Sequence, residues 1–188
     1  KKIIIEGDKS LSIRWALLSS QSSAKCRSSN LLLSEDVINT LNCLKKLGVK
    51  IKLTKNFCEI HGVGLNGFKY KKKLLLNAGN SGTLGRLIMG LLVHSKNDIK
   101  ITGDKSLSKR DFFRVSRPLG KFGAKYFTNY GKLPIIIKGT NNPIPITYHE
   151  TRGSAQCKSA VMLAALNTKG ETIIKAKKSR DHSELMFK

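Results

Sequence analysis

The sequence repeats itself with a period of about 72 residues. Three small and apolar stretches begin at Arg14, Arg86 and Ser159, and each follows a turn that contains Ser or Gly. Two further stretches, which begin at Asp36 and Asp111, align with each other without a gap, and each is followed by a glycine that suits the end of a helix. A repeat of this length is one supersecondary unit that has to bury its apolar face against its neighbours. We therefore expect a set of similar modules.

Hydrophobic periodicity predicts the same order of elements, βαβαββ, in every unit. The strands expected after the first helix of each unit lie at 31–33, 98–102 and 171–175. The other expected strands lie at 1–5, 49–54, 57–62, 72–76, 124–129, 133–139 and 145–148. The fold class is therefore α/β, with units at approximately 1–69, 70–140 and 141–188 in a single lobe. The third unit stops inside its second helix, so we expect a chain cut from a longer protein.

Charge and composition narrow the class of partner. The net charge of +23 is typical of nucleic-acid binding. However, 27 of the 35 basic residues are lysines spread along the chain, and aromatic side chains, on which single strands stack, make up only 6%. We favour a lysine-rich surface around a positive cleft for an anionic metabolite. The four scattered cysteines do not have the spacing of a metal site, and no apolar run is long enough for a membrane span.

Several arginines lie in or beside turns rich in Gly, Ser, Thr or Asp, and these turns precede predicted helices. The turns lie at 7–14, 79–86, 103–110, 153–158 and 179–182. Backbone N–H groups at a helix start favour anions, and arginine is a planar, bidentate anion ligand. Five such turns on a repeated scaffold predict a ligand with several anionic groups.

Each turn also has a simpler interpretation as a capped helix with solvated charges. Ser10 or Ser12 could cap the helix that follows the turn at 7–14. Asn80 or Thr83 could cap the helix that follows the turn at 79–86. The segment 103–110 repeats the first turn but precedes the second helix of its unit, so that this likeness could be accidental, although Lys109 and Arg110 would then still start a helix. No nucleophile–base pair is visible, which leaves polar transfer chemistry or binding.

Five motifs in this order and spacing closely resemble the 5-enolpyruvylshikimate-3-phosphate synthase family, in the bacterial forms often termed class II. They are GDKSLSIR, GNSGTLGR, SLSKRDFFRVSRPL, SAQCKSAVMLAALNTKGETII and SRDHSELM. The resemblance implies an inside-out α/β barrel of two lobes, each built from three βαβαββ units. This chain resembles most of the first-encoded lobe, and the second lobe is absent from it.

The resemblance implies an activity and its partners. The enolpyruvyl group of phosphoenolpyruvate would pass to the 5-hydroxyl of shikimate 3-phosphate, with release of phosphate and without a cofactor or a metal ion. The full-length enzyme would be a cytoplasmic monomer, and we expect the chain without its second lobe to be inactive. An RNA-binding or RNA-phosphate-processing protein built from related βαβαββ units is the alternative.

The resemblance also implies roles for individual residues. Lys9 and Arg110 would be catalytic. Shikimate 3-phosphate would be bound by Lys9, Ser10, Arg14, Ser154, Gln156 and Arg180, and phosphoenolpyruvate by Lys9, Asn80, Gly82, Arg110 and Gln156. The class II motifs would suggest tolerance of the inhibitor glyphosate, but tolerant family members carry alanine where Gly82 stands. We side with the glycine and expect a sensitive enzyme.

Overall fold

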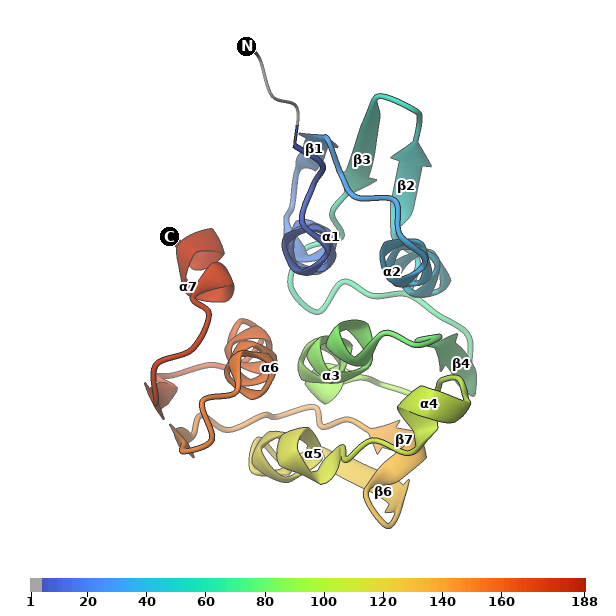
Figure 1. Cartoon of the computed structure of the whole chain (residues 1–188). Helices are drawn as coiled ribbons and strands as arrows, with labels where there is room; N and C mark the ends of the chain where they lie inside the picture. The colour runs from blue at the N-terminus through green and yellow to red at the C-terminus, as the bar shows by residue number, and fades with distance from the viewer. Residues whose placement is uncertain (1–4) are drawn as a thin grey trace. The chain divides into compact units, whose positions relative to one another are not determined.

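Contacts along the chain divide it into two units, Lys1–Tyr70 and Lys71–Lys188, and each unit has a core of its own. The structure is a computed structural model that describes residues 5–188. Figure 1 shows its helices and strands. The predicted strand at 1–5 lies outside the described residues except for Ile5, which belongs to no strand.

The first unit packs two helices on one face of a three-stranded sheet. Its elements are α1 (Lys9–Gln21), β1 (Lys25–Ser29), α2 (Glu35–Lys46), β2 (Lys50–Leu53) and β3 (Phe57–His61). The strand order is β1-β3-β2, with both pairs antiparallel. The helices contact each other, and Ile13, Leu17, Leu41, Leu44 and Ile60 are fully buried in this core. The outer face of the sheet is exposed, which explains the alternating burial along β1.

The prediction of a strand at 31–33 is wrong, because the strand of this segment lies earlier, at Lys25–Ser29. Asn30 ends the strand with a left-handed backbone (φ 57°), and Ser34 is already the N-cap of α2. The three leucines between them therefore form a short connection. The polar segment KCRSS is a strand because an edge strand with one exposed face does not need large apolar side chains.

The second unit contains two sheets and the remaining helices. Its elements are β4 (Leu74–Asn77), α3 (Gly82–Leu91), η1 (Leu92–His94), β5 (Ile99–Thr102), α4 (Lys105–Ser108), α5 (Phe113–Gly120), β6 (Lys125–Asn129), β7 (Lys132–Lys138), β8 (Thr147–Glu150), α6 (Ala155–Ala165), β9 (Ile173–Ala176) and α7 (His182–Phe187). The larger sheet has the order β4-β5-β7-β6, and β8 pairs with β9.

The repeat seen in the sequence returns in the strand pairing. The order β1-β3-β2 of the first unit is matched by β5-β7-β6 in the second, with antiparallel pairs in both. In the second unit β4 pairs in parallel with β5 across α3, and β8 pairs in parallel with β9 across α6. Two stretches of βαβ therefore follow the order that the sequence predicted.

The prediction that Lys109 and Arg110 start a helix is wrong. They follow the short helix α4, whose C-cap is Lys109, and α5 begins only at Phe113. The likeness between the segments 7–14 and 103–110 is nevertheless structural. Asp8 caps α1 by accepting a hydrogen bond from the backbone of Leu11 (2.7 Å), and Asp104 caps α4 in the same way. The cap of α1 is thus Asp8, and neither Ser10 nor Ser12.

A glycine sets the closeness of α3 and α6, which lie side by side in Figure 1. A Cβ atom at Gly90 would collide with the backbone carbonyl oxygen of Ala160. Because backbone cannot move aside as a side-chain end can, only glycine permits this approach. The first turns of the two helices also lie close together, since Gln156 of α6 bonds to Thr83 and Arg86 of α3, and those turns carry candidate site residues.

We expect Gly90→Ala to lower the free energy of unfolding by about 1–3 kcal/mol, the usual cost of an overpacked core. Gly120→Ala is the matched control, because nothing lies near a Cβ atom at this helical glycine. The control should be neutral or raise stability by about 0.5–1 kcal/mol. Urea unfolding of the two variants measures both effects, and equal stabilities would contradict the close approach of α3 and α6.

Candidate anion-binding site

In the first unit, three of the predicted site residues lie at the start of α1. Lys9, Ser10 and Arg14 all lie in the first two turns of this helix, and the backbone N–H groups of its first turn lack intrahelical acceptors. The Lys9 ammonium is half exposed and forms an ion pair with Asp36 (2.9 Å). Arg14 is only 5% exposed, and its guanidinium donates to the backbone oxygen of Ser10 (3.2 Å). The turn thus holds one accessible and one buried cation.

In the second unit, two guanidinium groups converge on the first residue of α3. A Cβ atom at Gly82 would lie 3.1 Å from Nη1 of Arg86 and 3.1 Å from Nη1 of Arg110. The two arginines come from different elements, since Arg86 lies in α3 and Arg110 in the turn between α4 and α5. The first N–H groups of α3 lie at the same place, so charged and neutral donors surround Gly82.

A chain of side-chain hydrogen bonds positions Arg110. Its Nη2 donates to Oδ1 of Asn80 (3.1 Å), and Nδ2 of Asn80 donates to Oδ2 of Asp104 (2.7 Å). The other carboxylate oxygen of Asp104 caps α4 (2.6 Å to the Leu107 nitrogen). Asn80 therefore orients Arg110, and the short helix α4 fixes this orientation.

Gln156 connects the first turns of α6 and α3. Its Oε1 accepts a hydrogen bond from Nη1 of Arg86 (2.7 Å), and its Nε2 donates to Oγ1 of Thr83 (3.2 Å). Arg86 also donates to the backbone oxygen of Asp111 (3.3 Å) and lies 5.2 Å from the ring centre of Phe112. Its partners are thus neutral groups.

The environment of Arg86 disfavours its positive charge. Burial lowers the pKa of its guanidinium, and the nearby charges of Arg114 and Arg110 lower it further, while Cys157 and Asp111 oppose this shift. The Nε atom of Arg86 is buried without a hydrogen-bond partner. A buried cation among like charges would be stabilised by a bound anion.

Ser154, the N-cap of α6, is prepared to donate a hydrogen bond. Its Oγ accepts from Nη2 of Arg114 (2.6 Å) and from the backbone nitrogen of Cys157 (3.3 Å). Because a hydroxyl oxygen has two lone pairs, its O–H group remains available to a ligand. A second bond joins Nε of Arg114 to Sγ of Cys157 (3.5 Å), and this bond is the main reason why the pKa of Arg114 is raised.

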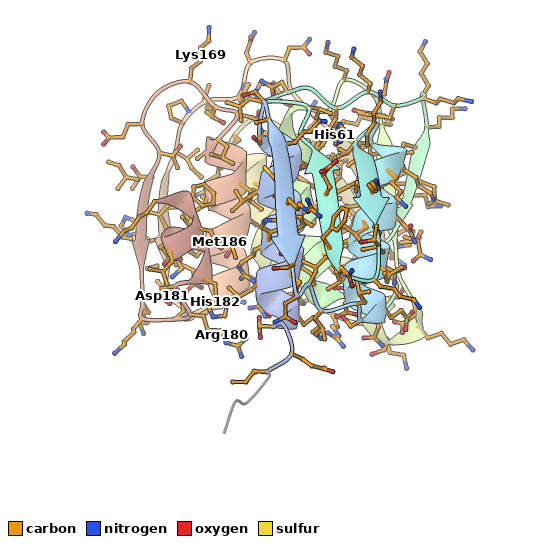
Figure 2. The ribbon with its side chains drawn as sticks, turned by 90° about the horizontal axis from the view of Figure 1, so that it is seen from above. His61, Lys169, Arg180, Asp181, His182 and Met186 are labelled. Carbon is orange, nitrogen blue, oxygen red and sulfur yellow. The ribbon has the colours of Figure 1, made fainter. Side chains whose placement is uncertain are left out.

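The structure brings together four of the predicted site residues, Asn80, Gly82, Arg110 and Gln156. Arg86 and Arg110 both lie beside Gly82, Gln156 bonds to Arg86, and Asn80 bonds to Arg110. Ser154 lies beside Gln156 at the start of α6. Arg180 lies in the exposed turn that leads into α7, where Figure 2 shows it with Asp181 and His182. Lys9, Ser10 and Arg14 belong to the other unit.

Sequence reasoning did not include two arginines among the site residues. Arg86 lies four residues after Gly82, one helical turn away, so the spacing alone could have placed it beside that glycine. Arg114 lies in α5, and it reaches Ser154 of α6 only through the packing of the two helices. No local signal predicts this second contact.

The arrangement can bind an oxyanion with fixed, preorganised donors. Among residues 5–188, no three His, Cys, Asp or Glu side chains are grouped so that they could hold a metal ion. In the same described part of the chain, no helix has the length and apolar character needed to cross a membrane.

We expect phosphate to raise the Tm of the chain and Arg110→Gln to abolish this increase. A ligand at a hundred times its Kd adds roughly 2.7 kcal/mol, and each kcal/mol raises Tm by roughly 2–4 °C for a chain of this size. Lys109→Gln is the control, since it removes the same charge one residue away and should keep the phosphate effect. Equal losses in both variants would indicate unspecific electrostatics and contradict the site.

Known proteins match the chain over its whole length. The family model of EPSP synthase (3-phosphoshikimate 1-carboxyvinyltransferase) matches residues 1–188. A 3-phosphoshikimate 1-carboxyvinyltransferase from Ruthia magnifica is 46% identical over 185 residues, which is 98% of this chain and 42% of the relative. One from Bradyrhizobium diazoefficiens is 41% identical over 191 residues, which is 100% of this chain and 40% of the relative. The chain thus spans about two fifths of the length of these relatives.

The fold agrees with these matches. A structure of EPSP synthase from Acinetobacter baumannii superposes with a TM-score of 0.92 at 37% identity, over 99% of this chain and 42% of the other. The α/β architecture predicted from the motifs, part of an inside-out α/β barrel, is thereby confirmed. On the full-length family match, the sequence identity and the fold, the chain belongs to the EPSP synthase family.

Proposed function

We propose that this chain forms the substrate-binding part of an enolpyruvyl transferase that joins phosphoenolpyruvate to shikimate 3-phosphate. The observation that carries this proposal is the convergence of Arg86 and Arg110 on Gly82, with neutral groups as the hydrogen-bond partners of Arg86. An anionic substrate would supply the missing negative charge. The family assignment favours this function over the RNA-binding alternative.

Phosphoenolpyruvate would bind at the start of α3. Arg110, oriented by Asn80, would hold one of its anionic groups through a charge-assisted hydrogen bond. Gly82 has no side chain, so the substrate can approach the backbone N–H groups of the helix. Gln156 lies between the first turns of α3 and α6, where it can contact both substrates.

Shikimate 3-phosphate would use the starts of α1 and α6. Ser10 and Arg14 would bind its carboxylate. Ser154 would donate its free O–H to the substrate, since both lone pairs of its oxygen are already engaged. Arg180, exposed in the turn before α7, would lie over the ring and its phosphate.

The reaction would proceed by addition and elimination. The 5-hydroxyl of shikimate 3-phosphate gives up its proton as its oxygen adds to the substituted carbon of the enolpyruvyl group, and the methylene carbon takes up a proton to become a methyl group. The tetrahedral intermediate then loses phosphate together with one proton of this methyl group, which restores the carbon–carbon double bond. Lys9 would lie between the two substrates and, with Arg110, stabilise the charge of this intermediate. The cleft would supply orientation. The acid–base carboxylates would come from a second lobe of the same polypeptide. The full-length protein would be a cytoplasmic monomer.

A chimera tests this proposal. We expect turnover when this chain replaces the matched segment of the Ruthia magnifica relative, measured as phosphate release from phosphoenolpyruvate and shikimate 3-phosphate. Lys9→Met and Arg110→Gln should each lower kcat by about 10²–10³, the usual cost of one donor to a developing charge. Lys25→Met and Lys109→Gln are the matched controls. Near-normal turnover with either Lys9→Met or Arg110→Gln would contradict the assigned roles.

The same chimera tests the role of Gly82. A methyl group at this position would lie 3.1 Å from two guanidinium nitrogens, so both arginines would have to shift by a few tenths of an ångström. Glyphosate is longer than phosphoenolpyruvate and should lose more from this shift, roughly 1–3 kcal/mol or about 5–150-fold in its inhibition constant. We expect Gly82→Ala to raise that constant more than the KM for phosphoenolpyruvate, with Gly120→Ala as the control. Parallel changes, or tolerance without the substitution, would contradict the steric argument.

A further inference from the structure

A second basic pocket lies on the other side of Arg114, between α5, β8 and the turn that leads into α6. Its volume is about 350 Å³, at the small end of the range for ligand pockets. Its lining includes Phe113, Arg114, Arg117, Tyr148, Arg152 and Cys157. Gly82, Arg86, Arg110 and Gln156 are not among the lining residues, so this pocket is separate from the start of α3.

The positive charges of the pocket exceed its available negative charges. Glu150 is buried, and its two oxygens accept the backbone N–H groups of Arg152 (3.1 Å) and Ser154 (2.7 Å). One oxygen of Asp111 accepts the backbone N–H of Phe113 (2.8 Å). These carboxylates accept hydrogen bonds from the backbone and also favour the charge of Arg114, but two carboxylates do not balance the three guanidinium groups of the pocket.

The guanidinium groups keep donors for a ligand. Arg114 uses Nε and Nη2 for Cys157 and Ser154, which leaves three of its five N–H donors. Arg152 is exposed at the rim. Arg117, also at the rim, lies 4.7 Å over the ring of Phe113 and thereby fixes the ring at the edge of the pocket.

Tyr148 adds a neutral donor. Burial raises the pKa of its phenol to about 12, so that the group stays protonated near neutral pH. Arg114, Arg152 and Tyr148 all line the pocket. One donor group thus comes from α5, one from the turn before α6 and one from β8. Pro118 and Phe113 supply apolar walls beside them.

We propose that this pocket binds a small organic carboxylate with a ring-sized apolar body. The carboxylate would accept hydrogen bonds from Arg114, Arg152 and Tyr148, and the ring would lie against Pro118 and Phe113. Arginine is suited to bidentate binding of carboxylates, and the volume is sufficient for a ring that carries a carboxylate. This proposal is independent of the function proposed for the start of α3.

Benzoate is the probe, titrated into the 188-residue chain and followed by amide chemical shifts and calorimetry. We expect the amides of Phe113, Tyr148 and Arg152 to shift most. Arg152→Gln should weaken benzoate binding roughly ten- to hundredfold, the range for one hydrogen bond to a charged group. Tyr148→Phe should weaken it as well. At the amides of Phe113, Tyr148 and Arg152, benzyl alcohol, which lacks the charge, and inorganic phosphate, which lacks the ring, should each bind at least about tenfold more weakly than benzoate.

The matched control is Arg110→Gln, which removes a guanidinium from the start of α3 and should leave benzoate affinity unchanged. Loss of benzoate binding in Arg110→Gln, or unchanged binding in Arg152→Gln, would overturn the proposal. Phosphate binding as tight as that of benzoate, with the same response to the variants, would overturn the assignment of a ring-bearing ligand. Arg152 is exposed, so its substitution does not disturb the core, and unchanged thermal unfolding checks this point.

Discussion

A buried positive charge at the start of a helix is the feature on which the candidate site depends. Arg86 lies in the first turns of α3, where the helix dipole already disfavours a cation. Burial and the charges of Arg114 and Arg110 add to this cost. Such an arrangement lowers stability unless a ligand supplies negative charge. A phosphate bound beside Arg86 and Arg110 would therefore be favoured, because it offsets the repulsion that Arg86 experiences from the neighbouring positive charges.

The internal repeat places one buried cation near the start of the first helix in each of three segments. Arg14, Arg86 and Lys158 follow one another at intervals of 72 residues, and all three are less than 10% exposed. Their surroundings differ. Lys158 forms an ion pair with Glu184 of α7, whereas the hydrogen-bond partners of Arg86 are the amide of Gln156 and a backbone oxygen. The cation at this repeated position thus has different roles. Lys158 stabilises the packing of α6 and α7, whereas Arg86 is placed to bind an anion.

Sequence reasoning predicted the elements whose signals are local. The helices and most strands follow from periodicity, and the turns before α1, α3 and α6 follow from their Gly, Ser and Asp residues. The prediction misplaced β1, because this polar edge strand has no hydrophobic pattern, whereas the leucines at 31–33 have the apolar character expected of a strand. It also missed α4, a single turn of helix. The contact of Arg114 with Ser154 joins residues forty positions apart, and only the packing of α5 on α6 creates it.

The two copies of the segment GDKSLS show how one local structure can serve different tasks. In each copy an aspartate caps a helix through the backbone of a leucine three residues later. Asp8 uses its carboxylate for this cap at the start of α1, next to Lys9, whose ammonium is drawn to Asp36. Asp104 has a second oxygen directed at Asn80, which in turn orients Arg110. The cap of α4 thus determines where a guanidinium lies two residues beyond that helix. Asp104 therefore has two roles. It caps α4, and through Asn80 it sets the position of Arg110 in the anion site.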